Sequence, residues 1–381
     1  MPIALTIPAR INILGNPSDG NEGDFATISA AVNLYAGAIV ESSPTILLRI
    51  LQSRPKDSSH LPAILDQLEY SPAQIPLPYD GRLDLIKAAF NRLYQYSSEL
   101  REKVRWQGLS ISFWSQVPRQ SGLGGSSLFV LLTLGCLREF YDLDRNIHND
   151  YILSELTQRA ESLELHITCG FADRYVPLFG GIAYLDYRGK LHHHPIGEEP
   201  LVTFERLDPW VRRFPIVAVS TGIQRDSGDV HGRMRPRYLE EHQHWINQGG
   251  CTPPMVLFMQ SAWKTAWRGK IALLSQDLET FGQLMNENHL LVDQMMQYCG
   301  FQDGAGWANN LLIETALKNG ALGAKLTGAG SGGSVFALTH PGEERQVIRA
   351  WKKTVKEADL TSAYIYQPKI ARQGLAVQHR D

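Results

Sequence analysis

The feature that most constrains the fold is a run of small residues between a predicted strand and a predicted helix. Residues 117–127 read V-P-R-Q-S-G-L-G-G-S-S, after a predicted strand at 109–113 and before a helix expected from about 126 to 141. Small residues here leave backbone N–H groups unobstructed at the start of the helix, where the helix dipole also attracts negative charge. The pattern predicts an anion-binding turn, although a flexible turn with a serine cap explains this segment alone equally well.

A second glycine-rich turn lies at 325–334, with the sequence K-L-T-G-A-G-S-G-G-S. Gly328, Gly330 and Gly333 match G-x-G-x-x-G, but a predicted strand follows, whereas the dinucleotide-binding motif opens a helix. No G-x-x-x-x-G-K-[ST] sequence occurs either, so a Walker loop is excluded. The glycines indicate close approach of other backbone or of a ligand.

A third segment, at 8–20, combines polar and apolar residues in alternation. Arg10 and Asn12 alternate with Ile11 and Ile13, so on a strand the two polar side chains share one face. That face points into a polar site or into solvent, and this segment alone does not decide between them.

Composition sets broad limits. The 381 residues carry a formal charge of −2, which excludes a general polyanion binder and leaves nucleic acid out of the expected partners. Four scattered cysteines without a C-x-x-C pair are typical of a reducing compartment. The longest apolar run, at 128–137, is too short to span a bilayer, and residues 1–10 lack a signal-peptide pattern. We therefore expect a cytoplasmic protein with no membrane partner.

The order of the predicted elements favours an α+β fold, because strands and helices mix without a regular β-α-β rhythm. A polar stretch between 189 and 215 predicts a domain boundary, with domains at 1–195 and 196–381. Residues 52–79, rich in proline, are expected to form a long excursion with a little helix. Trp263 and Trp267, four residues apart on a predicted helix, are expected to pack in the core.

Together, and in this order, the three segments resemble the motifs of the GHMP kinases, which include galactokinase and the homoserine, mevalonate and phosphomevalonate kinases. The resemblance covers nearly the whole chain. It implies a two-domain fold, an N-terminal domain like ribosomal protein S5 domain 2 and a ferredoxin-like C-terminal domain, with the active site between them. It also implies a kinase that uses ATP and Mg²⁺ on a small molecule, as a monomer or homodimer.

Matching the motifs residue by residue implies roles for individual positions. Ser126, together with Glu161 of an A-E pair, matches the metal site. Asp173, in a G-x-x-D pattern, matches the catalytic aspartate, with Arg10 beside it. The residues that match the nucleotide-binding turn are Pro118, Gly122, Leu123, Gly124, Gly125, Ser126 and Ser127. Those expected to line the substrate site are Arg10, Asn12, Asn16, Asp19, Asp173, Gly328, Ala329 and Gly330.

The acceptor is indicated by departures from the galactokinase pattern. Residues 15–19 read G-N-P-S-D where galactokinases have G-E-H-x-D, and this string resembles the plant glucuronokinases. So do the strings at 118–120, 172–174 and 226–231. A sugar acid needs a cation for its carboxylate, and Arg119, Arg174 and Arg225 are extra arginines beside the motifs. We expect phosphorylation of D-glucuronate at its anomeric hydroxyl. The alternatives are a kinase for galacturonate, a heptose, fucose or a neutral hexose, and a non-catalytic sensor of sugar and ATP.

Overall fold

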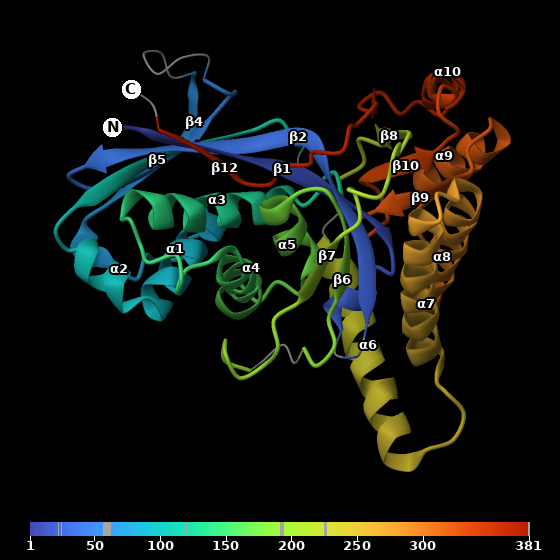
Figure 1. The fold of residues 1–381 in the computed structure, drawn as a ribbon, viewed down its shortest axis with the longest axis horizontal. Helices are drawn as coiled ribbons and strands as arrows, with labels where there is room; N and C mark the ends of the chain where they lie inside the picture. Colours follow the sequence, from blue (N-terminus) through green and yellow to red (C-terminus); the bar gives the residue numbers. More distant parts are fainter. Residues whose placement is uncertain are drawn as a thin grey trace.

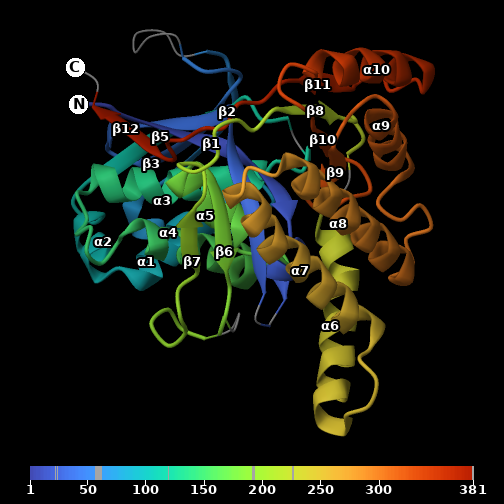
Figure 2. The ribbon, with the colours of Figure 1, turned by 45° about the vertical axis from the view of Figure 1, so that its right-hand side comes forward.

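The computed structural model describes residues 1–21, 23, 25–55, 62–118, 120–190, 194–224 and 227–379, and two β-sheets organise them. In Figure 1 the larger sheet lies above helices α1 to α5, while the smaller sheet lies against helices α8, α9 and α10. Helix α6 projects away from both, which is clearest in Figure 2. This mixed, two-part architecture is the α+β class expected from the sequence.

The larger sheet has eight strands among the described residues, in the order β12-β1-β2-β5-β3-β4, with β6 pairing β2 and β7 pairing β6. Its long central strands are apolar on the face that meets the helices, with Ile3, Leu5 and Ile7 buried against them. Its strands are β1 (Ile3–Leu14), β2 (Ala26–Ser43), β3 (Ile46–Leu51), β4 (Ile64–Tyr70), β5 (Gly108–Ser115), β6 (Ile182–Asp186), β7 (Thr203–Arg206) and β12 (Ala376–His379).

The smaller sheet is antiparallel throughout, in the order β11-β8-β10-β9. A separate apolar cluster, centred on the fully buried Trp351, packs between this sheet and helices α9 and α10. Its strands are β8 (Ile216–Ser220), β9 (Gly323–Thr327), β10 (Ser334–Leu338) and β11 (Tyr364–Tyr366).

The helices follow the apolar periodicity of the sequence. They are α1 (Asp84–Tyr96), α2 (Ser98–Lys103), α3 (Gly125–Phe140), α4 (Asp150–Arg159), α5 (Ala172–Phe179), α6 (Ser227–Gln248), α7 (Pro254–Leu274), α8 (Leu278–Tyr298), α9 (Trp307–Lys318) and α10 (Glu344–Glu357). Short helical turns occur at η1 (Ser18–Gly20), η2 (Pro72–Gln74) and η3 (Ala160–Glu164). Helix α3, apolar on nearly all sides, lies beneath β1 and β2 in the centre of the first domain (Figure 1).

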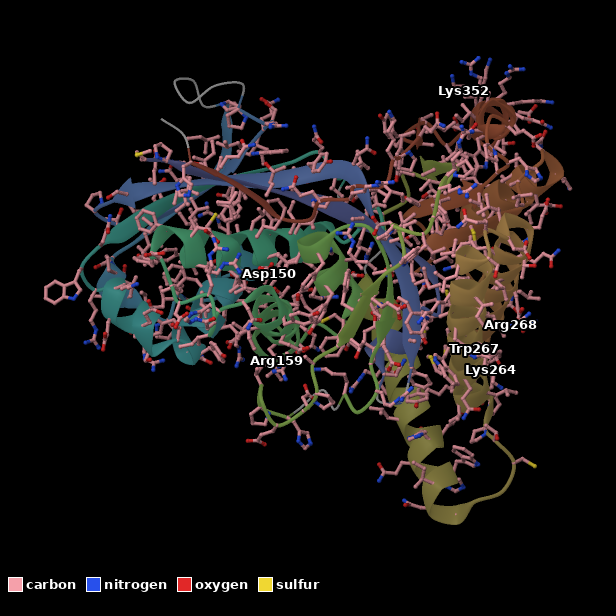
Figure 3. The ribbon with its side chains drawn as sticks, viewed as in Figure 1. Asp150, Arg159, Lys264, Trp267, Arg268 and Lys352 are labelled. Atoms are coloured by element: carbon pink, nitrogen blue, oxygen red, sulfur yellow. The ribbon has the colours of Figure 1, made fainter. Side chains whose placement is uncertain are left out.

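The structure corrects two expectations. Part of the stretch expected to be a long excursion forms edge strand β4, which pairs with β3. Trp267 is 41% exposed on the outer side of α7 (Figure 3), whereas Trp263 packs against an apolar cluster, so only one tryptophan of the pair contacts the core. The boundary expected after residue 195 stays a prediction, and strand pairing assigns both β7 and β12 to the larger sheet.

Candidate active site

The two glycine-rich turns lie against each other, backbone to backbone. A Cβ atom added to Gly122 would stand 2.3 Å from the Thr327 carbonyl oxygen, and one added to Gly328 would stand 2.7 Å from the Gly122 Cα atom. Both glycines also have positive φ angles, 72° and 84°, which side chains rarely adopt. The glycines are therefore required by contact between the turns, which joins the β5–α3 turn to the β9–β10 turn.

Arg10, at the centre of β1, links this junction to helix α5. Its Nη1 donates to the Gly122 carbonyl at 2.6 Å, and its Nε donates to Asp173 Oδ1 at 2.5 Å. A second guanidinium nitrogen, Nη2, donates to Asp173 Oδ2, which makes the pair bidentate. Arg10 is 3% exposed, so its charge is held in place by these acceptors rather than by water.

Asn12, two residues along β1 on the same face, completes the contacts of the aspartate. Its Nδ2 donates to Asp173 Oδ1 at 3.1 Å, and its Oδ1 accepts from the Ser29 hydroxyl at 2.9 Å. Burial alone would raise the pKa of Asp173, but the charges of Arg10 and Arg174 and the hydrogen bonds from Arg10 and Asn12 hold it well below its ordinary value. Asp173 is therefore a fixed carboxylate at the mouth of the site, with a side chain that is 21% exposed.

Asp19, on the short helical turn η1, contacts the start of helix α5. Its Oδ2 accepts from the backbone N–H groups of Phe171 and Ala172, at 3.1 and 3.0 Å. A carboxylate in this position satisfies free N–H groups and complements the helix dipole. Burial and then the repulsion of Asp173 nevertheless raise the pKa of Asp19. Gly170 is required beside it, because an added Cβ there would stand 2.2 Å from Asp19 Oδ2.

The start of α3 is open toward the site. Gly124 precedes the helix with a φ of 78° and no side-chain cap, so the first N–H groups are free for an anion. Ser126 is exposed at this end and Ser127 is buried, while Gly124 packs against the Arg10 guanidinium. Leu123 is buried, Pro118 is exposed just before the turn, and Gly125 begins the helix.

Glu161, on η3, is buried beside Arg174. One carboxylate oxygen, Oε2, accepts from Arg174 Nη2, whereas Oε1 is buried without a hydrogen-bond partner. An orphaned carboxylate oxygen suits a cation, and Mg²⁺ usually takes only one or two protein oxygens besides waters and phosphates. The donor set of Glu161 and Ser126 therefore fits the metal expected from the sequence. The described residues contain no cluster of three or more histidine, cysteine, aspartate or glutamate side chains that could hold a metal by themselves.

The three arginines expected to bind a carboxylate have different positions. Arg119 and Arg225 lie outside the described residues. Arg174 is 3% exposed, is paired with Glu161, and lies 3.7 Å from Asp173 through Nη1. Its Nε is buried without a hydrogen-bond partner.

Lys325, the first residue of the second glycine-rich segment, was not among the site residues expected from the sequence. It is fully buried, and its Nζ donates to Asn16 Oδ1 at 2.8 Å and to the Asn12 carbonyl at 3.4 Å. Burial lowers the pKa of Lys325 to about 7. The lysine thus holds two expected site residues of the first segment against strand β9. The glycine-rich turn that follows Lys325 was the available sequence signal.

His231, in the first part of α6, is the second residue that sequence reasoning missed. Its Nδ1 lies 4.0 Å from the position of a Cβ added to Gly20, in the loop that carries Asp19. Burial lowers the pKa of His231; Asp173 opposes this, and Arg174 and Arg10 add to it. No described residue hydrogen-bonds to this ring. It lies in the 226–231 string, but only the fold brings α6 to the motifs.

Comparison with known proteins shows which family the chain resembles. Residues 84–181 match the family model for the GHMP kinases N terminal domain, and residues 308–357 match GHMP kinases C terminal. The chain is 30% identical over 352 residues to probable glucuronokinase 2 of Arabidopsis thaliana, covering 91% of this chain and 87% of that one. It is 22% identical over 359 residues to D-glycero-alpha-D-manno-heptose 7-phosphate kinase of Campylobacter jejuni, covering 91% and 92%. Lactococcus lactis galactokinase, solved with galactose, has a similar fold, with a TM-score of 0.75 and 18% identity over 98% of this chain and 95% of that one. No described helix is long and apolar enough to cross a membrane.

Proposed function

Since the chain belongs to the GHMP kinase family and is an ATP-dependent sugar kinase, we propose that it phosphorylates D-glucuronate at the anomeric hydroxyl. The products are D-glucuronate 1-phosphate and ADP. The single observation that carries the proposal is the Arg10–Asp173 pair at the junction of the glycine turns, open on one side to the start of α3.

The pair suits phosphoryl transfer to a hydroxyl group. Catalysis of this reaction consists mostly of positioning and of stabilising charge on the transferring group. Asp173 is fixed by three hydrogen bonds and retains an exposed edge, so it can accept a hydrogen bond from the attacking hydroxyl. Because its pKa is low, Asp173 orients the hydroxyl first and takes its proton only as the O–P bond forms.

The transfer balances without a further reactant. The sugar oxygen forms a bond to the γ-phosphorus, the bond between that phosphorus and the β,γ-bridging oxygen breaks, and the electron pair leaves with ADP. The hydroxyl proton passes to Asp173 and then to solvent. Arg10 contacts both the Asp173 carboxylate and the Gly122 carbonyl of the glycine turn. From there its positive charge stabilises the negative charge on the phosphoryl group during transfer.

ATP and Mg²⁺ have suitable partners among the described residues. The free N–H groups at the start of α3 suit the phosphates, and Ser126 and Glu161 would hold Mg²⁺. When bound, the ion neutralises phosphate charge. Arg174 holds the other oxygen of Glu161, which fixes the orientation of that carboxylate.

The acidic acceptor is supported by the sequence strings shared with the plant proteins and by the charges around the site. Arg174 is engaged with Glu161, so it is a less direct partner for a substrate carboxylate than the sequence alone suggests. His231 is the half-buried ring that faces the same site from α6 with no hydrogen-bond partner among described residues. We therefore place the sugar between Asp19, Asp173 and His231, with the carboxylate toward the histidine.

The test is a coupled ADP-release assay over glucuronate, galacturonate, glucose, galactose, fucose and a heptose, followed by identification of the phosphorylated carbon by NMR. We expect glucuronate to give the highest kcat/KM and its 1-phosphate as product. A neutral sugar phosphorylated faster than every uronate would refute the acceptor and leave the sugar-kinase chemistry intact. The heptose is included because of the Campylobacter relative.

A further inference from the structure

A groove lies where the chain passes between the two sheets. It is an open surface groove with a volume of about 580 Å³. In the described residues, the chain leaves the larger sheet after β7 and returns to it after β11. Both crossing segments, 208–216 and 367–372, line the groove together with the turn before α10. The groove is therefore built from the connections that set the two sheets relative to each other.

Four cationic side chains line this groove: Arg212, Arg213, Lys369 and Arg372. All four are exposed, and none of their charged groups makes an ion pair or hydrogen bond with a described residue. The two acids in the lining, Asp208 and Glu344, offset only part of this positive charge. Asp208 has both oxygens on Arg206, at 2.9 and 2.7 Å, and Glu344 accepts from the Gly342 backbone.

This concentration of charge is local, because the formal charge of the whole chain is −2. Unpaired cations around a concave surface reinforce each other's potential and attract anions. The start of α10 lies beside the groove, but Glu343 and Glu344 already complement its helix dipole, so the attraction for anions comes from the four cationic side chains. The floor is apolar, with buried Pro215, Ile216 and Pro368.

We propose that this groove binds a phosphorylated small molecule that carries at least two negative charges. Arginine matches phosphate oxygens in bidentate geometry, and the apolar floor suits the carbon skeleton of such a molecule. The site is separate from the candidate active site, so the proposal does not depend on the identity of the acceptor.

A ligand in the groove would also contact the backbone that supports α5. The return segment continues from Lys369, whose carbonyl accepts from Asn33, to Ala371, whose carbonyl accepts from Gly181 at 2.8 Å. Farther on, the Leu375 N–H donates to Leu178 at the end of α5. Because Asp173 lies in the first turn of this short helix, we expect a ligand in the groove to affect the active site through the return segment and α5.

The first experiment measures binding of inorganic pyrophosphate, without Mg²⁺, to the full chain by calorimetry. The test variant is Arg213→Glu/Arg372→Glu. The control is Lys352→Glu/Lys356→Glu, which changes the net charge equally at two exposed α10 lysines without partners; Lys352 points outward in Figure 3. We expect saturable binding to the wild type with a Kd below about 1 mM, a loss of roughly tenfold or more in the test variant, and less than about twofold in the control.

The outcomes separate the groove from the phosphate site at α3. Binding that is unchanged in both variants would assign pyrophosphate to the nucleotide site and overturn the proposal, as would no binding to the wild type. An equal loss in both variants would show only a net-charge effect and also overturn it. If the test variant does not fold, as judged by urea unfolding, Arg212→Ala and Arg372→Ala replace it as single, milder changes.

Pyrophosphate at saturation is further expected to change the KM for the acceptor in the wild type and control but not in the test variant. Unchanged kinetics in all three would refute the coupling to α5.

Discussion

Replacing Asp173 by asparagine tests the centre of the site most directly. The native carboxylate accepts two hydrogen bonds from Arg10 and one from Asn12. Asparagine keeps the shape but brings an N–H group toward an Arg10 donor, and it leaves the buried guanidinium without a counter-charge. We therefore expect Asp173→Asn to lose both turnover and stability, for separable reasons.

The magnitudes follow from the geometry. Loss of the proton acceptor and orienting group should lower kcat by about 10²–10⁴-fold, which corresponds to about 3–5 kcal/mol in the barrier. Breaking a fully buried ion pair costs about 3–5 kcal/mol of folding free energy. The Asp173 side chain is 21% exposed, so solvent screens part of this cost and we expect about 1–3 kcal/mol.

Steady-state ADP release measures the first effect and urea unfolding the second. Asp150→Asn is the matched control, because Asp150 (labelled in Figure 3) pairs with Arg138 at 2.6 Å and makes no ion pair with a described residue of the site. It should lose little stability and no turnover. The double variant Arg10→Met/Asp173→Asn should recover stability relative to Asp173→Asn and remain inactive. Retention of more than about a third of wild-type turnover in Asp173→Asn would rule out the assigned role.

Three further predictions concern the surrounding groups. Ser126→Ala and Glu161→Gln should each shift the Mg²⁺ dependence of turnover to higher concentration, because each removes one of few protein oxygens; unchanged titrations in both would place the metal elsewhere. The pKa of Lys325 is about 7 in the folded chain against an ordinary 10.5, so the folded state binds fewer protons than the unfolded state between these values and stability should rise with pH there. Lys325→Met should abolish that rise, as measured by urea unfolding at pH 7 and 9.5, and an unchanged rise would assign it to other groups. His231→Gln should raise the KM for glucuronate about tenfold and leave that for glucose nearly unchanged, with exposed His244→Gln on the same helix as control; equal effects on both sugars would remove the histidine from carboxylate recognition.

The elements that carry the site could be predicted from the sequence because each has a local signal. The glycine turn before α3 and the helix itself, Arg10 and Asn12 on one face of a strand, and the second turn between two strands all appear where the patterns indicate. Glycine is required at Gly122 and Gly328 because the turns touch, which the sequence indicated only as close approach by an unspecified partner. The family resemblance supplied the pairing of Arg10 with Asp173 across 163 positions, which local pattern alone could not give.

Other features have no local signal. Strand β4 is largely exposed and polar on an edge, so its alternation is weak, and β12 is only four residues long. Helix α6 contains a proline and has few apolar residues. Its pattern of apolar residues therefore does not predict which face of the helix contacts the site. The burial of Lys325 could not be predicted, because lysine is rarely buried and its partners, Asn16 and the Asn12 backbone, come from the opposite end of the chain.

The arginines near the site show why counting charges in a sequence does not identify a substrate. Arg10 and Arg174 are both buried, and their charges are already committed to Asp173 and Glu161. A committed cation contributes to catalysis through the carboxylate that it fixes, and it gains little from a second anion because the first would have to be released. A group that recognises a substrate carboxylate must instead be uncommitted in the free protein. Among the described residues facing Asp173, His231 meets that condition with its ring unpaired, and neutral imidazole can donate or accept a hydrogen bond without the cost of burying a permanent charge.

A uronate would favour the protonated ring, so its binding should take up a proton near neutral pH, whereas binding of a neutral hexose should not. Calorimetry in two buffers of different ionisation enthalpy measures this uptake. Equal proton release or uptake for glucuronate and glucose would contradict the role of His231, whichever sugar proves to be the better substrate.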